Sequence, residues 1–137
     1  MTTTLTMEDQ DLVDAAGELL RRAHDAELHR VAVAARGGSG KVYMGLSLRT
    51  PRESVCAESS AIANAKMAGE TTVETIAAVG LAADDTPVVV NPCGLCREMV
   101  PVFSPEIRVI VNDGEALRVA SRSDLLPLPW VRARNYA

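Results

Sequence analysis

The chain has 137 residues, 47% of them apolar and 23% charged, and a formal net charge of −4 at pH 7. This length and composition predict a single globular domain, 1–137, that buries enough apolar surface to fold without disulfide bonds. The acidic balance and the aromatic content of 3% argue against a polynucleotide partner, which needs clustered basic residues and stacking platforms.

The first third of the chain is predicted to form a helix followed by a β-hairpin. Apolar residues recur at helical spacing over 7–24, and the Thr6 hydroxyl can cap the start of this helix. Apolar residues then alternate over 29–36, a pattern typical of a strand. The glycine-rich segment 37–40 predicts a tight turn, after which 41–49 is expected to return as the second strand.

Helical and strand patterns alternate along the rest of the chain. The expected elements are a helix over 57–68 ended by Gly69, a strand over 72–81, a helix that starts at Pro92 and stops near Pro101, strands over 107–111 and 116–120, and a helical turn capped by Ser123. Helices that alternate with strands predict the α/β class, with one mixed sheet covered on both faces.

The cysteine count and the start of the chain indicate a compartment. Three cysteines are an odd number and cannot close a disulfide framework. Residues 1–11 are polar and acidic, unlike a secretory signal, and no apolar run approaches the about 18 residues that a membrane span needs. We therefore expect a cytoplasmic protein without a membrane partner, in which a Cys-x-x-Cys motif indicates metal or redox chemistry.

All three cysteines lie where a helix is expected to begin. Cys56 precedes the helix over 57–68, while Cys93 and Cys96 stand one turn apart at the start of the next helix. Free amide groups and the positive end of the helix dipole favour thiolates there, and thiolates bind Zn²⁺. Three protein ligands leave the fourth position of a tetrahedral zinc site for water, as in catalytic rather than structural sites.

Glu58 follows Cys56 by two residues and also falls in the first helical turn. Its carboxylate can therefore reach a water at the metal without ligating the metal itself. A carboxylate in that place can accept a proton from the water and return it to a leaving amine. The spacing predicts that Glu58 is the catalytic acid–base.

The two motifs Cys56-Ala57-Glu58 and Pro92-Cys93-Gly94-Leu95-Cys96 resemble the signature of the zinc deaminase superfamily. The all-cysteine ligand set and the short length are similar to cytidine deaminases and blasticidin-S deaminases. The resemblance covers nearly the whole chain. It implies a three-layer cytidine-deaminase-like fold, with a mixed five-stranded sheet flanked by helices, assembled as a homotetramer or dimer with active sites near subunit interfaces.

The resemblance also implies roles for individual residues. Cys56, Cys93 and Cys96 would hold zinc, and Glu58 would move protons. The backbone around Ala57 and Asn91 would hydrogen-bond the aminated ring, and Trp130 stands where the family places an aromatic ring over the substrate.

One departure from the family concerns the substrate. Cytidine deaminases carry Asn-x-Glu on the second strand to hold the ribose hydroxyls, whereas this chain has Ser47-Leu48-Arg49. A guanidinium cannot accept a hydrogen bond from a hydroxyl. Arg49 therefore suits carbonyl oxygens or an anionic substituent better than a plain ribose.

A second departure concerns charge at the metal. Three thiolates on Zn²⁺ leave a net charge of −1, and the relatives offset it with an arginine beside the catalytic Glu or between the paired cysteines. Ser59 and Leu95 occupy those positions here, so the amides at the helix starts are expected to bond the sulfurs, and Arg97 is a further candidate to offset the charge.

The sequence thus predicts a hydrolase that cleaves the exocyclic C–N bond of a small aminated heterocycle. The first choice of substrate is a cytosine-like or related nucleobase, with or without a modification, and the alternative is a blasticidin-S-type or cytidine-type nucleoside. A non-catalytic zinc module would need a fourth protein ligand, and the only histidines, His24 and His29, lie far from both motifs in the sequence. A redox protein would leave Cys56 without a role.

Overall fold

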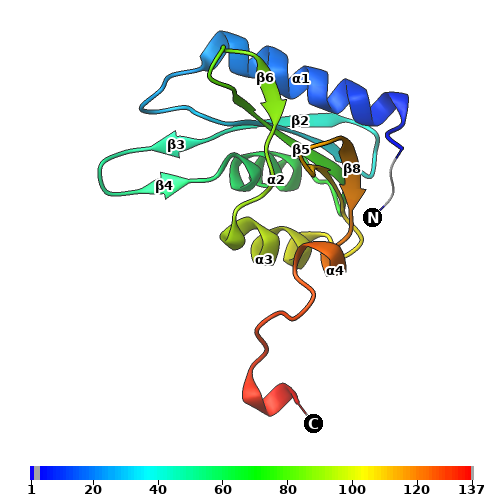
Figure 1. Ribbon diagram of the computed structural model, residues 1–137. Helices are drawn as coiled ribbons and strands as arrows, with labels where there is room; N and C mark the ends of the chain where they lie inside the picture. The colour runs from blue at the N-terminus through cyan, green and yellow to red at the C-terminus, as the bar shows by residue number, and fades with distance from the viewer. Residues whose placement is uncertain (2–3, 137) are drawn as a thin grey trace.

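Helices cover both faces of a central sheet in the computed structural model, which describes Met1 and residues 4–136 (Figure 1). In chain order the elements are α1 (Met7–Ala23), β1 (Ala32–Gly37), β2 (Val42–Leu46), β3 (Leu48–Arg49), β4 (Ser54–Val55), α2 (Ala57–Met67), β5 (Val73–Leu81), β6 (Pro87–Val89), α3 (Gly94–Phe103), β7 (Arg108–Asn112), β8 (Leu117–Ala120), α4 (Arg122–Leu125) and the 3-10 helix η1 (Ala133–Asn135). None of the described helices combines the length and apolarity that crossing a membrane requires.

The sheet has the strand order β2-β1-β5-β7-β8, and the short β6 pairs with the end of β5. The pairing of β5 with β7 is parallel, while all other pairs in this sheet are antiparallel. The predicted mixed sheet flanked by helices is therefore confirmed. The structure adds β6 as a sixth, short strand, where the sequence analysis expected no element between the strand over 72–81 and the helix starting at Pro92.

Alternation along the strands separates two apolar cores. Ala32 and Ala34 of β1 face α1, whereas Val33 and Ala35 of the same strand face α2. On the first side, Leu12, Ala16 and Leu20 of α1 are fully buried against the sheet at helical spacing. The core on the other side packs α2 and α3 against the sheet, so both cysteine-bearing helices lie in one layer (Figure 1).

The first helix is fixed to the sheet at its N-terminal end. Thr6 caps it as predicted, and Asp9 bonds back to the Thr6 amide in a capping box. The Asp9 carboxylate is also buried against Arg108 of β7, which donates to both of its oxygens at 2.8 Å.

The predicted hairpin differs from the structure at its outer end. The second strand stops at Leu46, and the chain then forms a separate two-stranded sheet of β3 and β4. The break falls at Ser47, whose hydroxyl accepts hydrogen bonds from the amides of Arg30 and Val31. The first strand correspondingly begins at Ala32 rather than at residue 29.

Three helix boundaries differ from the prediction. Pro92 precedes the N-cap residue Cys93 instead of opening α3, and the helix continues through Pro101 to Phe103. A proline removes one helical donor, and here the buried Pro101 ring packs in place while the Ser104 amide still bonds the Val100 carbonyl. The last helix, α4, is capped by Ser121 rather than Ser123, because Ser121 stands three residues before Asp124 and forms a capping box with it.

Candidate metal centre and active site

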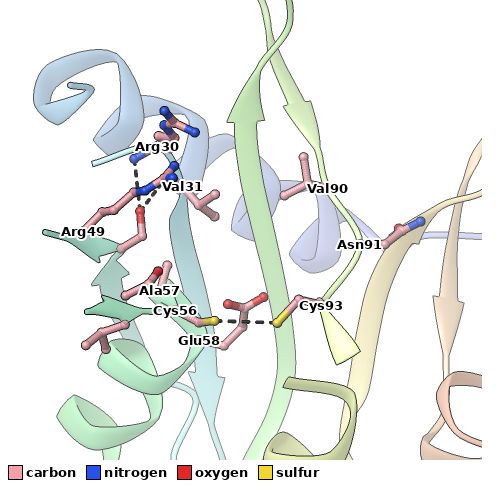
Figure 2. A pocket seen from close by; sticks show the side chains of 12 residues that line it. Arg30, Val31, Arg49, Cys56, Ala57, Glu58, Val90, Asn91 and Cys93 are labelled. Carbon is pink, nitrogen blue, oxygen red and sulfur yellow. Dashed lines mark hydrogen bonds between the residues drawn. The ribbon is translucent and has the colours of Figure 1, made fainter. Parts of the chain in front are cut away.

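The N-terminal ends of α2 and α3 bring the three thiols together. Cys56 is the N-cap residue of α2, Cys93 is the N-cap residue of α3, and Cys96 lies in the first turn of α3. Neither N-cap side chain bonds the backbone of its helix, so both sulfurs remain available as ligands. All three sulfurs lie within 4.8 Å of one another, and the Cys56 and Cys93 sulfurs are 3.6 Å apart (Figure 2).

This donor set fits zinc. Zn–S bonds of about 2.3 Å in a tetrahedron place the sulfurs about 3.8 Å apart, close to the spacing observed here. Across the described residues, no histidine, carboxylate or further cysteine joins this group. The chain therefore offers three soft ligands and leaves one position of the tetrahedron to a ligand from solution.

The thiols differ in how readily they ionise without a metal. Burial raises the pKa of Cys96, and the negative charge of Glu58 adds to the rise. Burial is also the main reason that the pKa of Cys56 is raised. Burial acts in the same direction on Cys93, but the nearby Cys96 and Leu95 amides and the other two thiols stabilise its thiolate and outweigh burial, so its pKa is lowered. A cation is needed to hold all three as thiolates at neutral pH.

The Glu58 carboxylate lies beside this group. Its side chain is 7% exposed, and it lines the same pocket as Cys56 and Cys93 (Figure 2). Among the described residues, no side chain or backbone group hydrogen-bonds this carboxylate, so its oxygens are available to a water or a substrate.

Close packing of α2 on β2 sets the position of Glu58. At Gly45 a Cβ atom would lie 2.2 Å from the Ala57 carbonyl oxygen and 2.5 Å from the Ala61 amide nitrogen. The Ser60 hydroxyl accepts a hydrogen bond from the Leu46 amide at 3.1 Å, which joins the same two elements. Only glycine allows the first turn of α2 to approach the strand this closely.

The pocket in front of the thiols has a volume of about 220 Å³. Of the residues that the sequence analysis assigned to substrate binding, four line it: Ser47, Arg49, Ala57 and Asn91. Trp130 does not line it. Its side chain is 74% exposed, in a C-terminal segment that runs away from the body of the chain (Figure 1).

The Asn91 side chain is directed to the neighbouring strand rather than to the pocket. Its Nδ2 donates to the Asn112 carbonyl at 2.8 Å, and its Oδ1 accepts from the Asn112 amide at 2.7 Å. These bonds attach the segment before Cys93 to the end of β7. Only the backbone of Asn91 is left to face a ligand, which is the group that the resemblance assigned to the ring.

Arg97 bonds the backbone around the metal site. Its Nε donates to the Pro92 carbonyl at 2.9 Å, and its Nη1 donates to the Leu125 carbonyl at 3.3 Å. The guanidinium thereby braces the approach to Cys93 against α4. Arg97 directly follows Cys96 in the sequence, but the two hydrogen bonds of its side chain are to carbonyl oxygens rather than to a sulfur atom.

Sequence reasoning missed five residues that line the pocket: Arg30, Val31, Ser54, Val55 and Val90. Arg30 and Val31 precede β1, and they reach the pocket because Ser47 bonds their amides. No motif marks these positions. The one available signal was a basic residue, Arg30, near the start of the strand predicted over 29–36, opposite Ser47 near the end of the strand predicted over 41–49.

Comparisons with known proteins bear on this site. Residues 6–112 match the family model described as the cytidine and deoxycytidylate deaminase zinc-binding region. The chain is 29% identical over 137 residues to the blasticidin-S deaminase of Bacillus cereus, in an alignment that covers 96% of this chain and 98% of that protein. It is 38% identical over 85 residues to the cytidine deaminase of Shewanella halifaxensis. This alignment covers 59% of this chain but only 25% of that longer protein.

Solved structures show the same fold. The cytidine deaminase from Burkholderia pseudomallei aligns with a TM-score of 0.72 at 28% identity, covering 92% of this chain and all of that one (100%). The cytidine deaminase from Bacillus anthracis aligns with a TM-score of 0.75 over 95% of this chain and 94% of that one, and at 21% identity it supports the fold alone. Because the matching family model spans most of the chain and includes both cysteine motifs, this protein belongs to the cytidine and deoxycytidylate deaminase family of zinc-binding enzymes.

Proposed function

We propose that this protein is a zinc-dependent hydrolytic deaminase that releases ammonia from a cytosine-like or related aminated nucleobase, free or modified. The observation that carries the proposal is the placement of Glu58 in one pocket with a three-thiol group that fits zinc. Cys56, Cys93 and Cys96 are the proposed ligands. When bound, zinc lowers the pKa of a water toward neutrality and so supplies the nucleophile.

Glu58 moves the protons in the proposed reaction. Attack adds the water oxygen to the ring carbon that carries the amine, and the C–N bond to that amine breaks. Of the two water protons, one ends on the adjacent ring nitrogen and one on the departing amine, which leaves as ammonia. A buried carboxylate without a hydrogen-bond partner among the described residues can carry both protons in turn.

The Ala57 and Asn91 backbones orient the ring in this proposal. Both residues line the pocket beside the thiols. Because the Asn91 side chain is held by Asn112, the adjacent backbone is fixed and can form a ring contact with little loss of conformational freedom.

The second candidate substrate is a blasticidin-S-type or cytidine-type nucleoside. The end-to-end similarity to a protein named blasticidin-S deaminase favours it, since the two chains have nearly the same extent. A structural zinc module is a third reading, and the open pocket in front of only three ligands argues against it.

We further propose that the protein works as a homo-oligomer, a tetramer or a dimer, in the cytoplasm, where thiol ligands stay reduced. Large apolar side chains are exposed on α3 and the C-terminal segment, including Leu95, Val102 and Leu128. Trp130 lies outside the pocket of its own chain, so a role over the substrate would be exerted in the pocket of a neighbouring copy.

Glu58→Gln tests the function. We expect the variant to retain about one zinc per chain and to lose ammonia release by a factor of about 10² to 10⁴, the usual contribution of general acid–base catalysis. Zinc content is measured by atomic emission, and ammonia by a coupled assay across free bases, nucleosides and nucleoside antibiotics. Glu98→Gln on the exposed surface of α3 is the matched control and should change neither quantity. Undiminished turnover by Glu58→Gln would contradict the proposal.

A further inference from the structure

We propose that the end of the pocket opposite the thiols is an oxyanion subsite, in which Arg30, Ser47 and Arg49 bind a carboxylate or phosphate carried by the substrate. The inference rests on the deaminase function proposed above and adds the chemical class of the ring substituent. Figure 2 shows Arg30 and Arg49 at one end of the pocket, with Cys56, Glu58 and Cys93 at the other.

Hydrogen bonds fix the side chain of Arg30 and the backbone of Arg49. The Arg30 Nε donates to the Ala26 carbonyl at 2.6 Å, and the Arg49 amide donates to the Leu28 carbonyl at 3.0 Å. The segment before β1 and the start of β3 are thus tied together. Within the described part of the chain, neither guanidinium forms a salt bridge, so this end of the pocket is lined by two arginines without a carboxylate partner.

The Ser47 hydroxyl also favours a ligand that accepts hydrogen bonds at this end of the pocket. Its oxygen already accepts from the Arg30 amide at 3.0 Å and from the Val31 amide at 2.9 Å. A hydroxyl has two lone pairs and one proton, so Ser47 has only its proton left to offer. Ser54 also lines the pocket and can act in either role. Ser47 and the two arginines therefore offer donors only, which suits an oxyanion rather than sugar hydroxyls that need acceptors.

The shape of the substrate connects the two ends. In a cytosine ring, the amine-bearing carbon and the nitrogen that carries a substituent lie on opposite sides of the ring. With the amine directed to Glu58 and the thiols, the substituent must point toward Arg30 and Arg49.

The test compares three compounds that share one ring: cytidine, cytidine 5′-carboxylate and cytidine 5′-monophosphate. For the zinc-loaded protein we expect kcat/KM for at least one anionic compound to exceed that for cytidine by tenfold or more, equivalent to about 1.4 kcal/mol. The better of the two anionic compounds identifies the oxyanion as carboxylate or phosphate. A kcat/KM for cytidine equal to or above both others would overturn the inference.

Arg49→Gln should lower the ratio of anionic to neutral kcat/KM by about tenfold, because one charge-assisted contact is lost. Arg52→Gln is the matched control, since Arg52 is exposed in the turn between β3 and β4 and does not line the pocket. It should leave the ratio unchanged. A ratio that falls equally in both variants would assign the effect to general surface charge and reject the subsite.

Binding gives a readout that does not depend on turnover. The zinc-loaded Glu58→Gln variant is titrated calorimetrically with the same three compounds, and the anionic ones should bind about tenfold more tightly than cytidine. Equal or weaker binding by both would overturn the subsite, whatever the turnover of the unchanged protein. If instead the anionic compounds bind tightly but neither they nor other cytosine-bearing compounds release ammonia, the subsite stands and the proposed function fails.

Discussion

At the scale of single residues, the position of a side chain in its helix decides what it can do. Cys56 and Cys93 are N-cap residues that leave their helices uncapped by a side chain, which frees both sulfurs for a metal. Glu58 lies two positions after the N-cap residue Cys56, and its carboxylate has no partner among the described residues. Function and local helix stability therefore compete at these positions.

Asp9 shows the opposite case, a polar residue used only for stability. Its carboxylate is 0% exposed and receives two bonds from Arg108. The Arg108 guanidinium is the main reason that the pKa of Asp9 lies below its usual value of 3.8, and burial partly opposes it. A lowered pKa in the folded state stabilises the fold above the unfolded pKa, and this contribution is lost as pH falls through the folded value.

We therefore expect Asp9→Asn to lower the free energy of unfolding at pH 7 by about 2 kcal/mol, since a charge-assisted pair is removed. The difference between the variant and the unchanged protein should shrink as pH falls below 3.8. Urea unfolding over a pH series measures both effects. Asp11→Asn, an exposed residue on the same helix, should reproduce neither. A pH-independent difference for Asp9→Asn would show that charge plays no part.

At the scale of elements, the contact between α2 and β2 positions the proposed acid–base. The helix packs directly on the strand at Gly45, and its first turn carries both Ala57, which lines the pocket, and Glu58. A displacement of α2 would move these groups relative to Cys93 and Cys96, which belong to a different helix. The geometry of the site thus depends on how closely a helix approaches the sheet.

Gly45→Ala should destabilise the fold by about 1–3 kcal/mol, the usual cost of overpacking, and lower ammonia release as well. The added Cβ would lie 2.2 Å from a backbone oxygen, and backbone cannot turn aside as a flexible side chain can. Thermal unfolding and the ammonia assay measure the two effects. Gly94→Ala is the control for stability, because a Cβ at Gly94 would meet nothing within 4 Å. Stability equal in both variants would contradict the tight packing inferred here.

At the scale of the whole molecule, the C-terminal segment is the feature that a single chain leaves unexplained. Beyond α4 the chain runs away from the sheet, and it exposes Leu128 by 93% and Trp130 by 74% (Figure 1). Such side chains are typical of surfaces that another molecule covers. Our proposal of a homo-oligomer places Trp130 at the pocket of a neighbouring copy.

Complementation between subunits tests this arrangement. Trp130→Ala and Glu58→Gln should each have low activity alone, whereas co-expression of the two should restore part of it. In a mixed assembly, some pockets combine Glu58 of one subunit with Trp130 of its neighbour. Light scattering gives the oligomeric state, and separately purified proteins mixed under conditions without subunit exchange are the control. Mixed assemblies no more active than the single variants would contradict the placement of Trp130.

Short-range features of this chain were predictable from its sequence. The helix capped by Thr6 follows from local capping and apolar spacing. The two strands of the parallel pair, β5 and β7, follow from their apolar content. The two cysteine motifs and Glu58 were recognisable because each motif lies within one helical turn. Errors arose where burial outweighed local preference, as at Pro101, which is buried inside a helix that a proline would locally be expected to end.

By itself, the sequence determined which groups are available: three thiols, one nearby carboxylate, and Ser47 and Arg49 in place of a ribose-binding pair. Only the tertiary structure decided which of them meet. Cys56 and Cys93 are 37 positions apart, and the packing of α2 and α3 on one face of the sheet brings their sulfurs to 3.6 Å. Arg30 lines the same pocket, and its amide donates a hydrogen bond to the hydroxyl of Ser47, 17 positions away in the chain. Contacts across such separations depend on the whole packed core, and a local pattern carries no record of them.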